Sequence, residues 1–600
     1  MPRFEKLAEY VIDFLARQGV THVFGMSGGA AVHLFDAAAR HPDVTPVFGQ
    51  HEQSSAMSAD GYARITGRLG VAITTSGPGA TNLLTGTCCS FYDSVPTLML
   101  TGQVATHRLK GDRAVRQVGF QETDVLSIFG TVTKHAEQLR APQDIRAALE
   151  RALFHAFEGR PGSVLLDIPD DLQRAEIDPA TLVGFTPPAP GAEDFAPAFA
   201  ELAALLARAE RPALVLGGGL STPRVGPELV ALIDRLDMPV LATWAGLDCI
   251  GHDHPNFVGP FGVYGPRLGN YVVQNADLLL CLGTRLSQNV TGGILESFAR
   301  SAHIVMVDAD AAEMAKFDGR GIRVTTRIAA RLDRFVPAWL AALGNAALAR
   351  PAWHARIEGW RASLPHDAAP PPPAGRIDAQ HLVAALPAVM GAEEAVFVDT
   401  GGTLTWTCNG LRLRPGQRLV SAWNNTPMGY ALPAAIGAAM ATGQANSCVI
   451  GDGGLMLCLG ELATLVRHRL PVRVVLFNNA GHGIQKQTLE TWLGGNYVGV
   501  DEASGLAFTD FAAVGRAMGL PVFVLDAPDG IAAGLAAAYA TDGPVLIDAR
   551  VMPAQKLYPV LKFGAALENQ LPAMDPEQIA REMVIPPYAG AVRAGGTPGV

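Results

Sequence analysis

Charge, lysine and long apolar runs are all scarce in this chain of 600 residues. Charged residues make up 17% of the chain and the formal net charge is −10, which argues against nucleic acid or an anionic membrane as the main partner. No apolar run approaches the roughly 18 residues needed to cross a bilayer, so we expect no membrane-spanning segment. Hydrophobic residues still make up 49%, which is typical of a soluble globular protein.

Cysteine spacings typical of metal or redox sites are also missing. The seven cysteines include no CxxC pair and none of the Cys/His spacings of a zinc site. We therefore expect buried, unpaired thiols in a reducing compartment, the cytoplasm. The opening stretch "MPRFEKLAEYVIDFLARQGV" predicts an amphipathic helix, because charges interrupt its apolar face and exclude a signal peptide.

Two stretches rich in proline and alanine punctuate the chain, at 184–197 and 364–380. Such composition is typical of linkers. They divide the chain into domains of ordinary size, with a tail at the end. The predicted boundaries are an N-terminal domain over 1–183, a central domain over 198–350, a C-terminal domain over 378–555 and a C-terminal tail over 556–600.

Short β-branched runs alternate with longer helical patterns in all three segments. Examples are "GVAITTS" in the first, "ADLLLCLG" in the second and "VRVVLF" in the third. Continuous apolar strands separated by helices indicate parallel sheets with both faces covered. The predicted fold class is therefore α/β, with three doubly wound parallel-sheet domains.

A polar residue follows each of two successive strands in the third segment. "SCVIGDGG" is a strand that ends at Asp452, and "VRVVLF" runs into a pair of asparagines whose second member is Asn479. A helical pattern separates them, so both strand ends should lie at the ligand-binding edge of one sheet. Their side-chain oxygens and the carbonyl of Gly481 would suit Mg²⁺. The alternative, a helix cap and a simple turn, does not explain the spacing.

GDG followed after 24 residues by NN resembles the diphosphate-and-magnesium motif of thiamine diphosphate enzymes, and the resemblance extends from about residue 3 to 560. It implies a pyrimidine-binding domain, a central FAD-type domain and a diphosphate-binding domain. Met428 falls where the family wedges a bulky residue between the cofactor rings; core packing is a compatible interpretation. The metal ligands would be Asp452, Asn479 and Gly481. The implied thiamine diphosphate contacts are Gly401, Gly402, Thr403, Thr426, Met428, Gly451, Asp452, Gly453, Gly454, Asn479, Gly481 and Ile484.

Glu52 is the residue to which the resemblance gives the central catalytic role. It lies just past a strand in "VFGQHEQSSAM", at the start of a helix. In the family a glutamate here hydrogen-bonds the aminopyrimidine ring and activates the cofactor. A first-turn glutamate favoured by the helix dipole is the alternative. The other catalytic candidates are Gly29, Phe120, Gln121, Met428 and His482, and a surface role for His482 stays open.

The first and third domains are separate units, so Glu52 and Asp452 should not meet within one chain. In the family the site forms between two subunits, which implies a homodimer or homotetramer. The central domain resembles the FAD-binding version found in acetolactate synthases. A remnant fold or an adenine nucleotide site stays open there. The candidate FAD contacts are Gly217, Gly218, Gly219, Thr243, Gly283, Arg285 and Asp308.

The closest overall pattern is the acetolactate synthase catalytic subunit, with three departures. Asp170 replaces a lysine, Asn289 replaces the arginine that grips the second 2-oxoacid, and Thr488 replaces a tryptophan. A stretch at about 107–116 is added. Loss of a bidentate carboxylate clamp favours a neutral acceptor, such as an aldehyde, a ketone or a keto-sugar.

The resemblance thus implies a thiamine diphosphate- and Mg²⁺-dependent carboligase. It would decarboxylate a 2-oxoacid, with pyruvate the expected donor, and transfer the acyl carbanion to an acceptor carbonyl. One alternative is a true acetolactate synthase, with pyruvate also as acceptor. Others are a lyase of 2-hydroxy ketones or 2-hydroxyacyl thioesters, and a non-enzymatic homologue, against which the intact Glu52, Asp452 and Asn479 argue.

Overall fold

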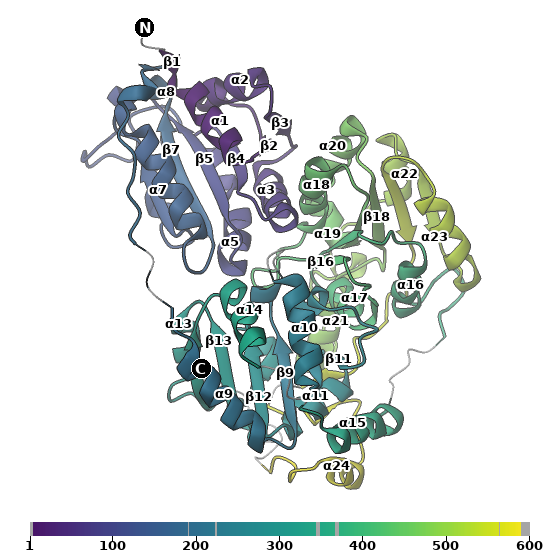
Figure 1. Cartoon of the computed structure of the whole chain (residues 1–600). Helices are drawn as coiled ribbons and strands as arrows, with labels where there is room; N and C mark the ends of the chain where they lie inside the picture. The colour runs from purple at the N-terminus through teal and green to yellow at the C-terminus, as the bar shows by residue number, and fades with distance from the viewer. Residues whose placement is uncertain are drawn as a thin grey trace.

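Three lobes make up the molecule, and each is built on its own six-stranded parallel sheet with helices on its faces (Figure 1). The computed structural model describes residues 4–189, 191, 193–221, 225–343, 348–365, 371–562 and 564–589. The predicted α/β class with three doubly wound domains is confirmed. No helix among these residues is long and apolar enough to cross a membrane.

The N-terminal domain has the strand order β3-β2-β4-β5-β7-β6, all parallel. Every residue of β4, β5 and β7 is buried, as expected for β-branched strands covered on both faces. Helix α3 (Glu52–Thr66) follows β3 and places Glu52 at the strands' carboxyl edge. The strands are β2 (His22–Gly25), β3 (Thr45–Phe48), β4 (Gly70–Thr74), β5 (Thr97–Gln103), β6 (His135–Gln138) and β7 (Ser163–Pro169).

The central domain has the order β11-β10-β9-β12-β13-β14. Its strand order reverses on either side of β9, and the loops after β9, β12 and β13 share one edge. The strands are β9 (Pro212–Leu216), β10 (Val240–Ala242), β11 (Phe257–Pro260), β12 (Leu278–Leu282), β13 (His303–Asp308) and β14 (Val324–Ala329).

The C-terminal domain has the order β16-β15-β17-β18-β20-β19. Strands β17 and β18 are parallel neighbours along their whole length, which confirms the predicted β-α-β unit around GDG and NN. The strands are β15 (Ala395–Val398), β16 (Arg418–Val420), β17 (Asn446–Gly451), β18 (Val472–Phe477), β19 (Val522–Leu525) and β20 (Val545–Ala549). The helices that matter for the site are α17 (Gly402–Gly410), α18 (Ala431–Thr442), α19 (Asp452–Leu457) and α21 (Gly483–Leu493).

The C-terminal tail packs against the central domain. After Lys556 it forms a two-stranded ribbon, β21 (Val560–Leu561) with β22 (Gln570–Leu571), and helix α24 (Pro576–Glu582). The Gln274 amide donates a hydrogen bond of 2.5 Å to Glu568, and the backbone N–H of Val584 donates one of 2.7 Å to Asn275. Apolar tail side chains, among them Leu567, join the central core, so this part of the tail is a structural element of that domain.

Candidate active site

Asp452 is the buried anchor at the carboxyl end of β17. It begins α19, is 2% exposed and accepts hydrogen bonds from the backbone N–H groups of Gly453 (2.7 Å) and Gly481 (3.1 Å). Burial is the main influence on its carboxyl group and raises its pKa to about 6. The β17–α19 turn and the loop after β18 are thus tied together through one carboxylate.

Two further oxygens lie near Oδ2 of this carboxylate. In the orientation that the structure gives the Asn479 amide, its oxygen lies 2.7 Å from the carbonyl oxygen of Gly481 and 3.1 Å from Oδ2 of Asp452. Turning the amide over would convert both contacts into hydrogen bonds. Mg²⁺ binds oxygens at about 2.0–2.1 Å in octahedral geometry, which places neighbouring ligands about 2.9 Å apart. The two observed separations bracket that value, so the donor set fits Mg²⁺.

Gly453 is the point where two predicted catalytic side chains meet. A Cβ atom added to it would lie 2.5 Å from Nε2 of His482 and 2.7 Å from Cε of Met428. A side chain at this position would therefore push the tips of His482 and Met428 aside. His482 is half-buried, and burial lowers the pKa of its imidazole. It lies next to Met428 and follows Gly481 in the loop after β18.

Other predicted diphosphate contacts gather at the same edge. A Cβ atom on Gly401, whose φ is +82°, would lie 3.7 Å from Ile484, and one on Gly451 would lie 3.9 Å from Thr403. Gly402 begins α17, and its N–H groups face the sheet edge where a diphosphate would lie. The structure thus brings the residues predicted around β15, β17 and β18 into one region.

Asp399 is a site residue that the sequence analysis did not single out. Its carboxylate is 1% exposed and accepts hydrogen bonds from the backbone N–H groups of Thr400, Gly429 and Ala431, at 3.0–3.1 Å. It therefore fixes the turn that carries Met428, in which Thr426 has a φ of +46°. Burial raises the pKa of Asp399 to about 6. The sequence feature that could have indicated Asp399 is an aspartate directly after a buried strand, in "VDTGGT".

Glu52 lies in the N-terminal domain with its side chain buried, at 8% exposure. The amide Nδ2 of Asn82 donates a 2.9 Å hydrogen bond to Oε2, which holds the carboxylate in place. Oε1 is 3.5 Å from where a Cβ on Gly79 would lie, in the turn after β4. A Cβ on Gly29 would meet nothing within 4 Å, so the backbone there borders open space.

Phe120 and Gln121 lie beside this turn. The backbone of Gln121 has a φ of +61° and packs against Gly77, which also has a φ of +61°. A Cβ on Gly77 would approach Cβ of Gln121 to 2.9 Å. Gln121 is therefore held close to the strand-to-helix turn that contains Gly79. The Phe120 side chain, by contrast, is 85% exposed in the single chain.

Glu52 and Met428 do not meet within one chain. Helices α3 and α18 pack antiparallel, with Gly61 against Ala434 and Ser58 against Gly437. Tyr430, next to the start of α18, lies beside Arg64. Glu52 is twelve residues before Arg64, which is roughly 18 Å along the helix. The two halves of the predicted site are thus at opposite ends of this helix pair.

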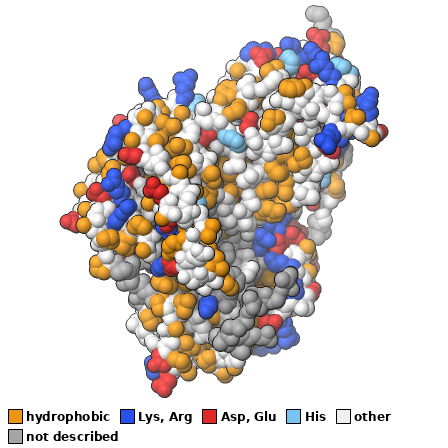
Figure 2. Space-filling view, turned by 180° about the vertical axis from the view of Figure 1, so that it is seen from behind, with side chains coloured by type: hydrophobic (Ala, Val, Ile, Leu, Met, Phe, Trp, Pro, Cys, Tyr) orange, Lys and Arg blue, Asp and Glu red, His pale blue; other side chains and the backbone are white. Residues whose placement is uncertain are grey.

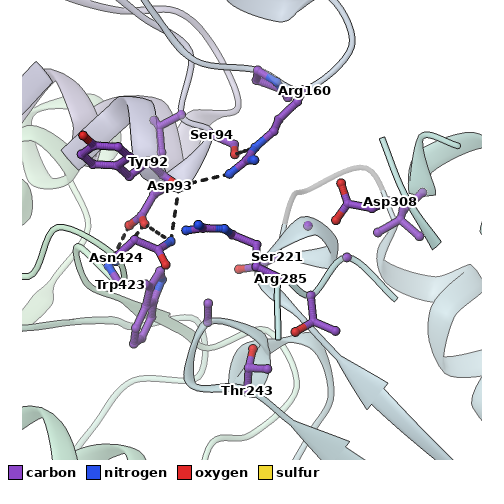
Figure 3. Close-up of a pocket in the computed structure, with 18 of the residues that line it drawn as sticks. Tyr92, Asp93, Ser94, Arg160, Ser221, Thr243, Arg285, Asp308, Trp423 and Asn424 are labelled. Atoms are coloured by element: carbon purple, nitrogen blue, oxygen red, sulfur yellow. Dashed lines mark hydrogen bonds between the residues drawn. The ribbon is translucent and has the colours of Figure 1, made fainter. Parts of the chain in front are cut away.

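A separate cavity of about 300 Å³ lies where the three domains face one another. Figure 3 shows Arg285, Asp308 and Thr243 on one side, with Asp93, Arg160 and Asn424 opposite. Arg285 donates a 2.8 Å hydrogen bond to Glu313, and burial raises the pKa of Asp308. The predicted FAD contacts on its wall are Gly218, Gly219, Thr243, Gly283, Arg285 and Asp308. Gly217 packs directly behind them, against the backbone of Gly283.

Comparison with known proteins identifies the three lobes. Residues 5–128 match the model of the thiamine pyrophosphate enzyme N-terminal domain, residues 199–335 the central domain and residues 399–549 the C-terminal domain. The chain belongs to the thiamine diphosphate (pyrophosphate) enzyme family. The resemblance found in the sequence is confirmed.

Relatives in this family match this chain over most of its length. The acetolactate synthase large subunit of Parasynechococcus marenigrum is 33% identical over 568 residues, covering 93% of this chain and 89% of that protein. The large subunit of acetolactate synthase isozyme 2 from Escherichia coli is 33% identical over 570 residues, covering 94% and 99%. The chain is therefore an acetolactate synthase-like member of the thiamine diphosphate enzymes.

The three positions predicted to depart from the acetolactate synthase pattern lie in different parts of the structure. Asp170 begins a short helix at the carboxyl end of β7, and its buried Oδ1 has no hydrogen-bond partner among the described residues. Asn289 lines the cavity between the domains. Thr488 is exposed and donates a hydrogen bond to the carbonyl of Ile484 in its own helix. Gln487, the residue before it, donates a hydrogen bond to the carbonyl of Leu557 and accepts one from its backbone N–H.

Proposed function

We propose that this protein decarboxylates a 2-oxoacid, with pyruvate as the expected donor, and transfers the resulting acyl group to an acceptor carbonyl. Thiamine diphosphate and Mg²⁺ are the cofactors of this reaction. The observation that carries the proposal is the convergence of the oxygens of Asp452, Asn479 and Gly481 at separations suited to Mg²⁺. This pattern lies beside Met428 and Gly453, where the cofactor rings would be held.

Bound thiamine diphosphate supplies an electron sink for the loss of CO₂ from the 2-oxoacid. The chain supplies the surroundings. Glu52 holds or moves a proton at the aminopyrimidine nitrogen, and Asn82 orients its carboxylate. Asp399 fixes the turn that presents Met428 between the two rings. The lowered pKa of His482 favours a neutral imidazole, which suits a group that accepts or returns a proton near the substrate.

The acceptor is a carbonyl compound whose reacting end bears no carboxylate. Asn289 cannot grip a carboxylate as a guanidinium does, and Asp170 places a negative charge at the carboxyl edge of the N-terminal sheet. A buried carboxylate oxygen without a partner would repel a second 2-oxoacid. These features support an aldehyde, a ketone or a keto-sugar.

The three-domain cavity supports a bound FAD. Its wall combines glycine-rich strand ends of the central domain with Thr243, Arg285 and Asp308, which are suited to a dinucleotide. Acyl transfer needs no redox step, so this flavin would hold the domains together. An adenine nucleotide remains the alternative occupant.

The active unit is at least a homodimer, with a homotetramer as the larger form. The opposite placement of Glu52 and Met428 on the α3–α18 pair supports this, because two chains related by a twofold axis can bring the Glu52 end of one against the Met428 end of the other. Cytoplasmic location stays a prediction from the cysteine pattern.

A donor and acceptor screen tests the proposal. Purified protein with thiamine diphosphate and Mg²⁺ is given pyruvate alone, and then pyruvate with aldehydes, ketones or keto-sugars, followed by product identification. We expect CO₂ release with a cross-coupled product. Accumulation of acetolactate from pyruvate alone would instead establish a true acetolactate synthase, the function named for its relatives. No CO₂ from any 2-oxoacid, with cleavage of a 2-hydroxy ketone or 2-hydroxyacyl thioester, would establish a lyase.

A further inference from the structure

The stretch predicted as an addition, about 107–116, and the two residues after it form a largely exposed loop of unusual charge, loop 107–118. Between His107 and Arg116 it holds four lysine or arginine residues against one aspartate, Asp112, which gives a net charge of +3 when His107 is neutral. The whole chain has a net charge of −10. Figure 1 shows this loop projecting from the N-terminal domain, away from the other two, and Figure 2 shows basic side chains at that outer edge.

The loop is held in shape by Glu122. Its carboxylate accepts hydrogen bonds from the backbone N–H groups of Lys110 (2.5 Å), Val118 (2.8 Å) and Gly119 (3.2 Å). These bonds keep the pKa of Glu122 below its usual value although burial opposes them. The guanidinium of Arg113 donates to two carbonyls inside the loop. The loop is therefore a closed, preorganised structure.

Of the remaining cations, two are exposed and Lys110 is partly buried. Arg108 and Arg116 are exposed, and no ion pair joins either of them or Lys110 to another described residue; Lys110 acts on Glu122 only at longer range. By contrast, Arg64 and Arg151 of the same domain are paired with carboxylates. Unpaired guanidinium groups on a fixed loop are suited to bidentate binding of phosphate.

The loop leads directly into the candidate active site. Two residues after Val118 comes Phe120, then Gln121, whose backbone packs against Gly77 in the same turn as Gly79, beside Glu52. An anionic group held by the loop would therefore belong to a molecule that reaches the Glu52 half of the site. Attraction between the loop and such an anion would also speed its capture.

We propose that loop 107–118 binds a phosphate group at the remote end of the acceptor, so that the substrate is a phosphorylated aldehyde or ketone. This rests on the proposed function and refines its acceptor: the reacting end is a neutral carbonyl, and the far end is anionic. A phosphate monoester and a nucleoside diphosphate share this chemistry.

The test compares glyceraldehyde 3-phosphate with glyceraldehyde as acceptors for pyruvate. The triple variant Arg108→Gln/Lys110→Gln/Arg116→Gln is set against Arg140→Gln/Arg174→Gln/Arg467→Gln, which removes the same charge from exposed positions elsewhere. We expect kcat/KM for the phosphorylated acceptor to fall at least about tenfold only in the loop variant, and to fall with added salt in the wild type. In the loop variant, kcat/KM for glyceraldehyde and the rate of CO₂ release from pyruvate alone should change less than about twofold. A different result would be that a nucleoside diphosphate, but not inorganic phosphate, inhibits the wild type and fails to inhibit the loop variant. That result would show that the anion bound by the loop is a nucleoside diphosphate.

Equal use of both acceptors by the wild type, or equal effects of the loop variant on both, would overturn the proposal. A loop variant that also has a smaller mass in solution would show that the cations pair with a second copy of the chain instead. A wild type that releases no CO₂ from any 2-oxoacid would defeat the proposed function, and that result is distinct from an active wild type whose loop shows no preference.

Discussion

Gly61 of α3 lies directly against the backbone of Ala434 in α18, and a Cβ on Gly61 would come within 2.1 Å of the Ala434 carbonyl oxygen. One on Gly437 would come within 1.9 Å of the Ser58 carbonyl oxygen. The N-terminal and C-terminal domains are therefore joined through two helices that touch backbone to backbone. This contact also sets where Glu52 and Met428 lie relative to each other.

We expect Gly61→Ala to push these helices apart. Overpacking of this kind costs about 1–3 kcal/mol, so the melting temperature and the activity should both fall. Gly359→Ala is the matched control, because it lies in a helix with nothing within 4 Å of an added Cβ and should stabilise slightly. Equal melting temperatures for the two variants would contradict the tight contact.

Glu52→Gln should lower turnover by about 10²–10⁴-fold, because the amide cannot take up and return a proton at the cofactor. Binding of thiamine diphosphate, measured by calorimetry, should change little. Glu176→Gln, an exposed glutamate of the same domain, serves as control. If Glu52→Gln turned over at the wild-type rate, the catalytic role of Glu52 would be excluded.

Mixing two inactive variants should restore activity. Glu52→Gln leaves the Asp452 half intact, and Asp452→Asn leaves the Glu52 half intact. When mixed subunits reassemble at random, about half of the dimers are hybrids with one intact site of two, so about a quarter of the wild-type activity should return. A mixture that stays inactive after reassembly, with hybrids verified by mass, would place each site within a single chain.

Asp399→Asn should lower kcat, because the amide's one NH2 group would face the backbone N–H of Gly429 or that of Ala431 and so move Met428. Stability should respond to pH as well. Burial raises the pKa of Asp399 from 3.8 to about 6, so between these values the folded state holds a proton that the unfolded state releases.

The contribution of Asp399 to the free energy of unfolding therefore rises as the pH falls through 6. Once the pH is below both pKa values, the gain is about 1.4 kcal/mol for each unit by which folding raises the pKa. The asparagine variant lacks this gain. The difference in melting temperature, wild type minus Asp399→Asn, should grow between pH 7 and pH 5. A constant or shrinking difference would show that Asp399 does not bind a proton in this range.

Arg285→Ala should reduce bound flavin, because it removes a cation from the wall of the three-domain cavity and releases Glu313. The measurement is the visible absorbance of the purified protein per chain. Arg327→Ala, which breaks an exposed pair with Asp318 in the same domain, should leave it unchanged. Purified wild type with no flavin, even after incubation with FAD, would count against the FAD assignment.

Local pattern was enough to predict the three sheets and the metal-ligand loop. Runs such as "VRVVLF" become buried parallel strands, and the β-α-β spacing by itself forces Asp452 and Asn479 to one sheet edge. Gly453 of GDG fits the same pattern, since a Cβ there would displace His482 and Met428. The buried cysteines follow from composition: five of the seven are buried and all are unpaired.

Tertiary structure alone decided the features that join distant segments. Asp399 reaches the Met428 turn across about thirty residues, and its role depends on hydrogen bonds that no local spacing encodes. The tail is part of the central domain because its apolar side chains pack into the core of that domain. The sequence determined which side chains are candidates for the chemistry, whereas the close packing of α3 on α18 decided that Glu52 and Met428 lie at opposite ends of this helix pair. Such packing depends on contacts between residues hundreds of positions apart.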